Sequence, residues 1–371
     1  MHDTDPIPAA SRTQHIADWL RLEQAPGVGR KSAAILLAEF GSPQAIFNAG
    51  YAALAAHVSP AKARTLCQPM APETARLAEA TLAWLGAPGH HLLTLHDAAY
   101  PPLLAHIPDP PLLLYINGRR ELLAQAALAI VGSRNASSQG TANATAFAQA
   151  LSGAGLAIVS GLALGIDAAA HTGALREAGS TIAVVGTGAD RIYPARNEAL
   201  ARRIADEGCI VSEQALGTAP LAANFPQRNR IISGLSAGVL VVEAAAESGS
   251  LITANLAADQ GREVFAMPGS IHSALAKGCH KLIRNGARLV ETVDEVLEAM
   301  RMSPLARAPA PQRDDGQGTL LAALGHGPVG FDALLAHTGS DVASLNSELL
   351  LLELVGLLER LPGGVFQRVV R

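Results

Sequence analysis

The segment LAIVGSR, residues 128–134, decides the fold, because a short apolar run ends there on a glycine, a hydroxyl and an arginine. Apolar runs of similar length recur at 156–159, 181–185, 209–212, 238–242, 263–267 and 288–290. Runs that do not alternate with polar residues are typical of parallel strands that are buried on both faces. The sequence therefore predicts a parallel sheet.

The stretches between these runs have helical periodicity and most end at a glycine, as helices often do: 138–151, 165–178, 197–207, 228–235, 249–259 and 276–285. Repeated strand and helix units require a sheet that is covered by helices on both faces. We predict an α/β fold, with a doubly wound Rossmann-like domain over residues 88–300.

The flanking regions predict two smaller domains. Residues 1–85 show short helical segments and no strand pattern, which indicates an all-α domain. Its turn Pro26-Gly27-Val28-Gly29 resembles a helix-hairpin-helix turn that can hold a DNA phosphate. A plain packing turn is the alternative, since only Arg30 and Lys31 supply charge there.

Residues 301–318 are rich in proline, alanine and charge, which predicts a linker. Residues 319–371 predict three helices and a hairpin at Pro362-Gly363-Gly364, the pattern of a winged helix. Its presumed recognition helix, residues 341–353, has acidic residues and no lysine or arginine. We expect no duplex DNA binding by this helix, and a core role for Leu345, Leu349 and Leu352, with a protein interface as the alternative.

Composition limits the function. The chain has 371 residues, of which 49% are hydrophobic and 16% charged, so it is expected to fold. The net charge of -4 means that only a local basic patch can hold a polyanion. Three cysteines without CxxC spacing indicate neither a disulfide framework nor a zinc site. Without a long apolar stretch, we expect a cytoplasmic protein with no membrane partner.

The chemistry should lie at the carboxyl ends of the strands, where ligands bind in such folds. Gly132-Ser133-Arg134 and Ser160-Gly161 follow two of the runs, and glycines with helix N-termini suit anions. The run Gly186-x-Gly188 is followed by Arg191, so the GxGxxG fingerprint is absent, as are Walker A and HExxH motifs. We predict no cofactor, no metal and no catalytic residue.

Arginines gather at the same edge, which favours a ligand with several phosphates: Arg134, Arg228 and Arg230. Phe225 beside them adds an aromatic ring, a combination that tracks single strands by stacking, although a core position is equally open. Asp167 and His171 are spaced i,i+4 and suggest either an acid/base pair or a helix cap beside a packed histidine.

Several strings together resemble the DNA processing protein A family, also called DprA or Smf: 129–137, 160–175, 181–197, 225–236, 239–254 and 261–270. The resemblance covers the Rossmann-like domain and extends to a SAM-like N-terminal domain and a winged-helix tail. It implies a non-enzymatic, homodimeric single-stranded DNA binder. Such a protein would protect incoming DNA in natural transformation and load the recombinase RecA past the single-stranded DNA-binding protein.

The resemblance also implies a DNA pocket whose residues can be named in this chain. They are Gly132, Ser133 and Arg134; Ser160, Gly161, Gly165 and Asp167; and Phe225, Pro226, Arg228 and Asn229. With Arg230, these form the predicted DNA site. We expect Arg134, Arg228 and Arg230 to pair with phosphates, supported by glycine N–H groups.

Two other functions remain possible from the sequence. One is a nucleotide-processing enzyme that resembles Rossmann-like phosphoribohydrolases, with Glu243 and Arg228 as catalytic groups; its PGGxGT loop is missing from the predicted strand ends. The other is a protein adaptor that binds no DNA. For the dimer, we expect the sheet edge at residues 279–290, where an edge strand would otherwise leave backbone groups unpaired.

Overall fold

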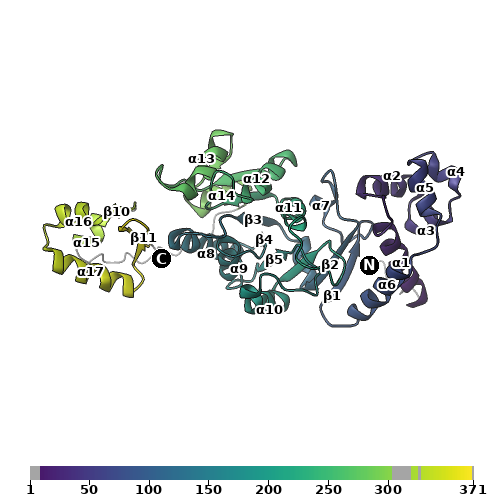
Figure 1. Cartoon of the computed structure of the whole chain (residues 1–371), viewed down its shortest axis with the longest axis horizontal. Helices are drawn as coiled ribbons and strands as arrows, with labels where there is room; N and C mark the ends of the chain where they lie inside the picture. The colour runs from purple at the N-terminus through teal and green to yellow at the C-terminus, as the bar shows by residue number, and fades with distance from the viewer. Residues whose placement is uncertain (1–8, 303–318, 325–326, 370–371) are drawn as a thin grey trace.

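A computed structural model describes residues 9–302, 319–324 and 327–369. The molecule is elongated, with the N-terminal helices at one end, the sheet in the centre and the C-terminal module at the other end (Figure 1). The predicted linker, 301–318, lies almost wholly outside the described residues.

The described part of the N-terminal region, from residue 9 on, contains helices and no strand: α1 Ala9–Glu23, α2 Arg30–Phe40, α3 Pro43–Asn48, α4 Tyr51–Ala55, α5 Pro60–Leu66 and α6 Pro72–Trp84. Its core includes the buried Trp19, Leu36 and Ile46, and it also takes in Leu113 and Tyr115 of the neighbouring sheet. The helices therefore pack directly against the edge of the central domain.

The central sheet has nine strands in the order β1-β2-β6-β5-β4-β3-β7-β8-β9. The seven that run parallel are β3 Ala127–Val131, β4 Ala157–Ser160, β5 Thr181–Val184, β6 Cys209–Ser212, β7 Gly238–Val241, β8 Glu263–Ala266 and β9 Arg288–Leu289. Each lies on a predicted apolar run. The parallel strands lie in the order β6-β5-β4-β3-β7-β8-β9, which reverses at β3 as in a Rossmann-like fold and confirms the predicted fold class.

One part of the sheet differs from the prediction. Strands β1 His90–Thr94 and β2 Leu113–Gly118 run antiparallel, and β2 pairs with β6. The apolar pattern predicts no strand at these residues and a purely parallel sheet. The two strands cover the edge of β6, which would otherwise be exposed, and mixed sheets often carry such an antiparallel edge.

Helices cover both faces of the sheet, as predicted. Leu128 and Ile130 of β3 face one core with α8 Ser138–Gly153, α9 Ile166–Ala174 and α14 Val293–Ala299. Ala129 and Val131 face the other core, together with α11 Asn224–Leu235, α12 Ser250–Asp259 and α13 Lys277–Arg284. The remaining helices are α7 Pro102–Ala105 and α10 Glu198–Glu207.

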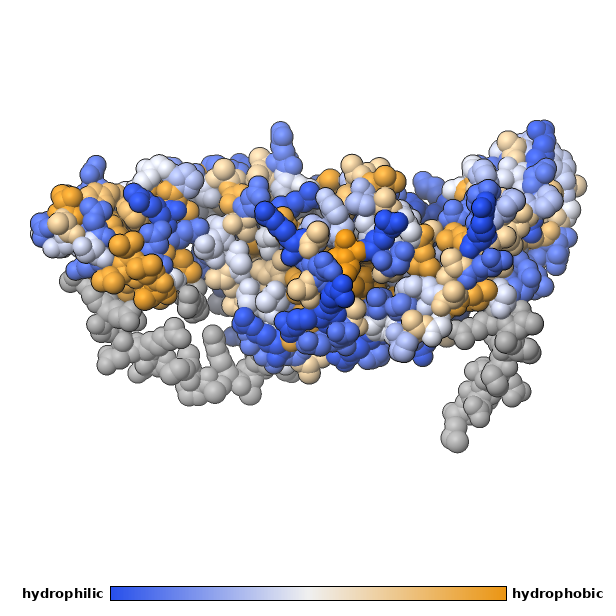
Figure 2. Space-filling view, turned by 60° about the horizontal axis from the view of Figure 1, so that its bottom comes forward, coloured by the Kyte–Doolittle hydropathy of each residue, from blue (hydrophilic) through white to orange (hydrophobic). Residues whose placement is uncertain are grey.

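The C-terminal module consists of α15 Thr319–Leu324, α16 Phe331–Thr338 and α17 Val342–Leu354, with a small sheet of β10 Val329–Gly330, β11 Leu358–Leu361 and β12 Val365–Arg368. Leu345 and Leu349 are buried in its core, as predicted, and Leu352 packs against it. Leu351 and Leu354 of α17 are exposed, and Figure 2 shows apolar side chains gathered on this module.

Two further features of the described residues bear on function. All three cysteines are free, with Cys67 exposed and the other two buried. None of the helices in the described ranges is long and apolar enough to cross a membrane.

The packing of β8 supplies a test of the fold. Phe265 is fully buried and packs against Gly238 of β7. A Cβ added to Gly238 would lie 2.9 Å from the Phe265 ring. We expect Phe265→Ala to lower the free energy of unfolding by about 3–5 kcal/mol. Ile35→Ala, on the exposed face of α2, should change it by less than about 0.5 kcal/mol. Urea unfolding of both variants measures this; equal stabilities would mean that β8 is not a buried strand.

Candidate functional site

A cavity of about 730 Å³ opens beyond the carboxyl ends of β3, β4 and β7. This is the point where the strand order reverses, because β4 and β7 lie on opposite sides of β3. We call it the crevice. Most of the predicted site residues line it: Gly132, Ser133, Arg134, Asp167, Phe225, Pro226, Arg228 and Asn229.

The turn after β3 places Arg134 at the rim of the crevice. Ser133 N–H donates to the carbonyl of Glu243 over 2.7 Å, and the Ser133 carbonyl accepts from Ile166 N–H over 3.1 Å. Gly132 permits this packing, because a Cβ there would lie 2.6 Å from the Ile166 side chain. Arg134 is exposed and makes no hydrogen bond or ion pair within the described residues, so its guanidinium is available to a ligand.

Arg228 is buried beneath the crevice. Its Nη1 donates to the carbonyl of Gly161 over 2.5 Å and to that of Val184, while Nε donates to Asn229 Oδ1 over 3.1 Å. Burial lowers the pKa of Arg228 to about 10, with Asp167 opposing the shift, so the side chain stays charged at neutral pH. The sequence predicts that Arg228 pairs with a phosphate. The structure places Arg228 as a buried, charged side chain in the floor of the crevice.

This correction has a local cause. Helix α11 begins at Asn224, four residues before the predicted start at 228. The earlier start turns Arg228 inward, against the loop that follows β4. Gly161 is needed there, since a Cβ would come within 2.1 Å of the Arg228 guanidinium.

Asp167 and His171 hold that loop and do not bond to each other. Asp167 Oδ2 accepts from the N–H groups of Gly161 and Ala163 over 3.1 and 3.3 Å. His171 Nε2 accepts from Leu162 N–H over 3.3 Å, so the ring proton lies on Nδ1, which donates to Thr181 Oγ1 over 2.7 Å. The prediction of an acid/base pair is therefore wrong. The prediction that Asp167 caps its own helix is also wrong, because Asp167 binds the loop that precedes α9.

Two more predicted residues support the crevice without lining it. Ser160 Oγ donates to the carbonyl of Ile130 over 2.6 Å. Gly165 has φ of +73°, and a Cβ there would approach the carbonyl oxygen of Ser133 to 2.3 Å. Ser160 and Gly165 thus fix the loops after β3 and β4 against each other.

The N-terminus of α8 is filled by the protein's own carboxylate. Glu243 accepts from Ser137 N–H over 2.9 Å and from Ser137 Oγ over 2.6 Å. A Cβ on Gly140 would come within 2.3 Å of that carboxyl group. The expected support of phosphates by N–H groups does not hold at this helix, and Glu243 is not free for the catalytic role considered above.

Arg230 lies on the other side of α11, since residues two apart on a helix differ by roughly 200° in direction. Its Nη2 pairs with Glu213, and its Nε lies 3.5 Å from Asp109 Oδ2. The same two carboxylates bind Arg30 of α2 over 3.2 and 2.9 Å. Arg230 therefore does not line the crevice with the other predicted site residues; its ion pairs join the sheet domain to the helical region.

The crevice also contains residues that the sequence analysis missed. Tyr193 is 45% exposed, and its ring lies 5.5 Å from that of the half-buried Phe225, so Phe225 is not an ordinary core residue. Ser248, Gly249 and Ser250 line the crevice where α12 begins after β7. Ser248, Gly249 and Ser250 lie several positions beyond Glu243, so they do not directly follow the apolar run 238–242 as Gly132-Ser133-Arg134 follow theirs.

The chain matches two family models: DNA recombination-mediator protein A over residues 91–301 and the DprA winged helix domain over residues 294–364. Protein Smf from Escherichia coli is 43% identical over 297 residues, which are 77% of this chain and 79% of that protein. DNA processing protein DprA from Streptococcus pneumoniae is 49% identical over 201 residues, 54% of this chain and 71% of that one.

Two solved structures are similar. The X-ray structure of DNA processing protein A from Streptococcus pneumoniae has a TM-score of 0.64 and 36% identity, covering 77% of this chain and 97% of that one. The protein from Helicobacter pylori, whose structure describes a single-stranded DNA binding mode, has a TM-score of 0.52 and 30% identity, covering 57% and 96%.

The buried His171 makes stability depend on pH. Burial, with Arg228 nearby, lowers its pKa from 6.5 to about 3, so the native state holds the ring neutral while the unfolded chain protonates it. This stabilisation is complete above pH 6.5 and should fall by about 1.4 kcal/mol per pH unit below it, until about pH 3.

We expect His171→Asn, which lacks the titrating ring, to lose less stability than the wild type between pH 6.5 and pH 5. His106→Asn, at an exposed histidine, should follow the wild type. Chemical unfolding at several pH values measures both slopes. Parallel slopes for His171→Asn and the wild type would show that the ring is protonated in the folded protein.

Proposed function

Because the chain belongs to the DNA processing protein A (DprA/Smf) family, we propose that it binds single-stranded DNA in the crevice without sequence preference. The observation that carries this proposal is the exposed, unpaired guanidinium of Arg134 above the buried charge of Arg228, with Tyr193 and Phe225 beside them. The Helicobacter pylori relative, described as binding single-stranded DNA, supports it.

The chemistry of the crevice fits such a ligand. Arg134 can pair with a phosphate, which every nucleotide carries, and the two aromatic rings can stack on any base. Neither contact distinguishes one base from another. Since the net charge of the chain is -4, the attraction must come from this local site and should weaken with salt.

We propose that the protein handles DNA without cutting it. Glu243 and Arg228, the groups that a nucleotide-processing enzyme would need, are engaged with Ser137 and with backbone carbonyls. By analogy with the family, we propose as the finer role the cytoplasmic protection of incoming single strands during transformation, and the loading of RecA past the single-stranded DNA-binding protein. The winged-helix module, without a cation on α17, would not bind duplex DNA in this scheme.

We also propose a homodimer through the β9 edge of the sheet. Ile271 is 68% and Leu289 43% exposed, and both line a surface hollow together with Ile283. Strand β9 pairs only with β8 among the described strands. An apolar patch beside an open strand edge is suited to a second copy, which would cover both.

A salt series tests DNA binding. We expect Arg134→Ala to weaken binding to labelled oligo-dT and to reduce the slope of log K against log salt by about 0.7, the value for one phosphate contact on a single strand. Fluorescence anisotropy measures both. Arg176→Ala, which removes an exposed arginine outside the crevice, should bind as the wild type does. A flat salt curve for the wild type, or unaltered binding by Arg134→Ala, would contradict the proposal.

Light scattering tests the dimer. Ile283→Glu places a charge in the apolar hollow, and we expect it to elute as a monomer where the wild type elutes as a dimer. Ile35→Glu, at an exposed position of α2, should remain dimeric. A dimer of unchanged strength in Ile283→Glu would rule out this edge.

A further inference from the structure

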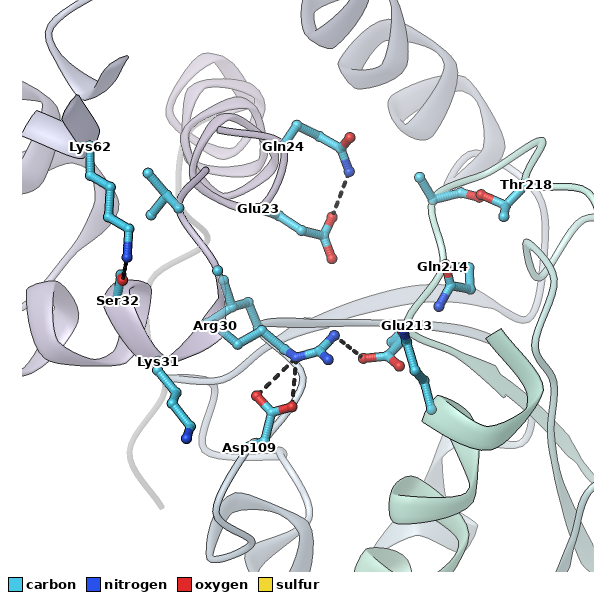
Figure 3. A pocket seen from close by; sticks show the side chains of 15 residues that line it. Glu23, Gln24, Arg30, Lys31, Ser32, Lys62, Asp109, Glu213, Gln214 and Thr218 are labelled. Atoms are coloured by element: carbon cyan, nitrogen blue, oxygen red, sulfur yellow. Dashed lines mark hydrogen bonds and ion pairs between the residues drawn. The ribbon is translucent and has the colours of Figure 1, made fainter. Parts of the chain in front are cut away.

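A second cavity of about 730 Å³ lies between the helical region and the sheet domain, and Figure 3 shows its side chains. We call it the interdomain cavity. Glu213 and Gln214, which line it, directly follow β6, and β6 runs parallel to β5. The interdomain cavity therefore lies at the same edge of the sheet as the crevice.

The segment 218–227 borders both cavities. Thr218 and Gln227 line the interdomain cavity, whereas Pro220, Phe225 and Pro226 line the crevice. A strand that leaves the crevice across residues 218–227 enters the interdomain cavity next.

The outer part of the interdomain cavity is positively charged, and this charge comes from the helical region. Lys31 and Lys62 line it, and Lys62 Nζ donates to Ser32 Oγ over 2.7 Å. Helix α2 begins there after Gly29, which has no side-chain cap. No bond within the described ranges satisfies the N–H groups of Arg30 and Lys31. Lysines beside a helix N-terminus favour the binding of a phosphate there.

The inner part of the interdomain cavity contains a hydrogen-bond acceptor, Glu213 Oε1, to which no group donates within the described residues. Glu213 has a side chain that is 5% exposed, and its Oε2 binds both Arg30 and Arg230. Oε1 has no hydrogen-bond partner in the part of the chain that the structure describes. A buried acceptor without a donor is costly, so a ligand N–H would be favoured there. Each DNA base carries an N–H on its pairing edge.

We propose that the interdomain cavity is a second subsite for the same DNA strand, with a phosphate on Lys31 and Lys62 and a base N–H on Glu213 Oε1. This inference rests on the proposed function. Desolvation raises the pKa of the neighbouring Glu23 to about 8, which weakens the repulsion between this carboxyl group and a phosphate.

A length series of oligo-dT tests the subsite. The wild type should gain affinity as the oligomer grows beyond the crevice, whereas the double variant Lys31→Ala/Lys62→Ala should level off at a shorter length. On long oligomers we expect it to bind about tenfold more weakly, with a salt slope smaller by about 0.7, the value for the one phosphate that the two lysines would hold. Arg64→Ala/Arg76→Ala removes two exposed cations of the same helical region outside the cavity and should match the wild type.

Two further probes separate the contacts. When the oligomer is extended with abasic sites, the salt-dependent part of the affinity gain should remain and the part due to the base should be lost. A full affinity gain without bases would overturn the contact to Glu213. Free dTMP should compete with long oligomers more than with short ones. If the double variant lost dTMP binding but kept the length dependence of the wild type, the cavity would be a nucleotide site, not part of the path.

The failures of the two proposals are distinguishable. Short oligomers that bind and need Arg134, with an identical length dependence for the wild type and the double variant, would overturn the subsite alone. No binding of any oligomer, or no effect of Arg134→Ala, would overturn the crevice and the subsite together.

Discussion

The crevice depends on one interaction, the insertion of the Arg228 guanidinium beneath the loop that follows β4. It ties helix α11 to the ends of β4 and β5 through the carbonyls of Gly161 and Val184. Asp167 lies close enough to oppose the desolvation of that charge, and it holds the same loop by two backbone N–H groups. A charged group that is buried with acceptors around it is costly to disturb. Arg228 is therefore held in the floor of the crevice, and the exposed Arg134 is left to meet a ligand.

Helix α11 also links the crevice to the helical region. Its two arginines point in opposite directions: Arg228 into the crevice floor and Arg230 into a cluster with Asp109, Glu213 and Arg30. The cluster joins α2 to the sheet domain with partly buried charges, and such pairs fix geometry more than they add stability. One short helix thus positions both cavities at the sheet edge, which is why a single strand could use them in succession.

The sequence predicted the sheet and the place of the site, because buried parallel strands are continuous apolar runs and ligands bind where the strand order reverses. Strands β1 and β2 were not predicted, because the proline-rich segment between them does not look like the turn of a hairpin. The start of α11 was also not predicted. Pro226 lies in the first turn of this helix, and a proline there is easily taken as part of a loop. The burial of charged side chains could not be predicted: charge made Arg228 and Arg230 look like phosphate ligands, and the bond between Glu243 and Ser137 joins residues 106 positions apart.

The most direct test is a crystal structure of the protein with a short thymidine oligomer. The account predicts that the oligomer lies in the crevice, with a phosphate against Arg134 and a base against Tyr193 or Phe225, while Arg228 keeps its carbonyl partners. An oligomer bound elsewhere, with the crevice closed by the protein's own side chains, would contradict it.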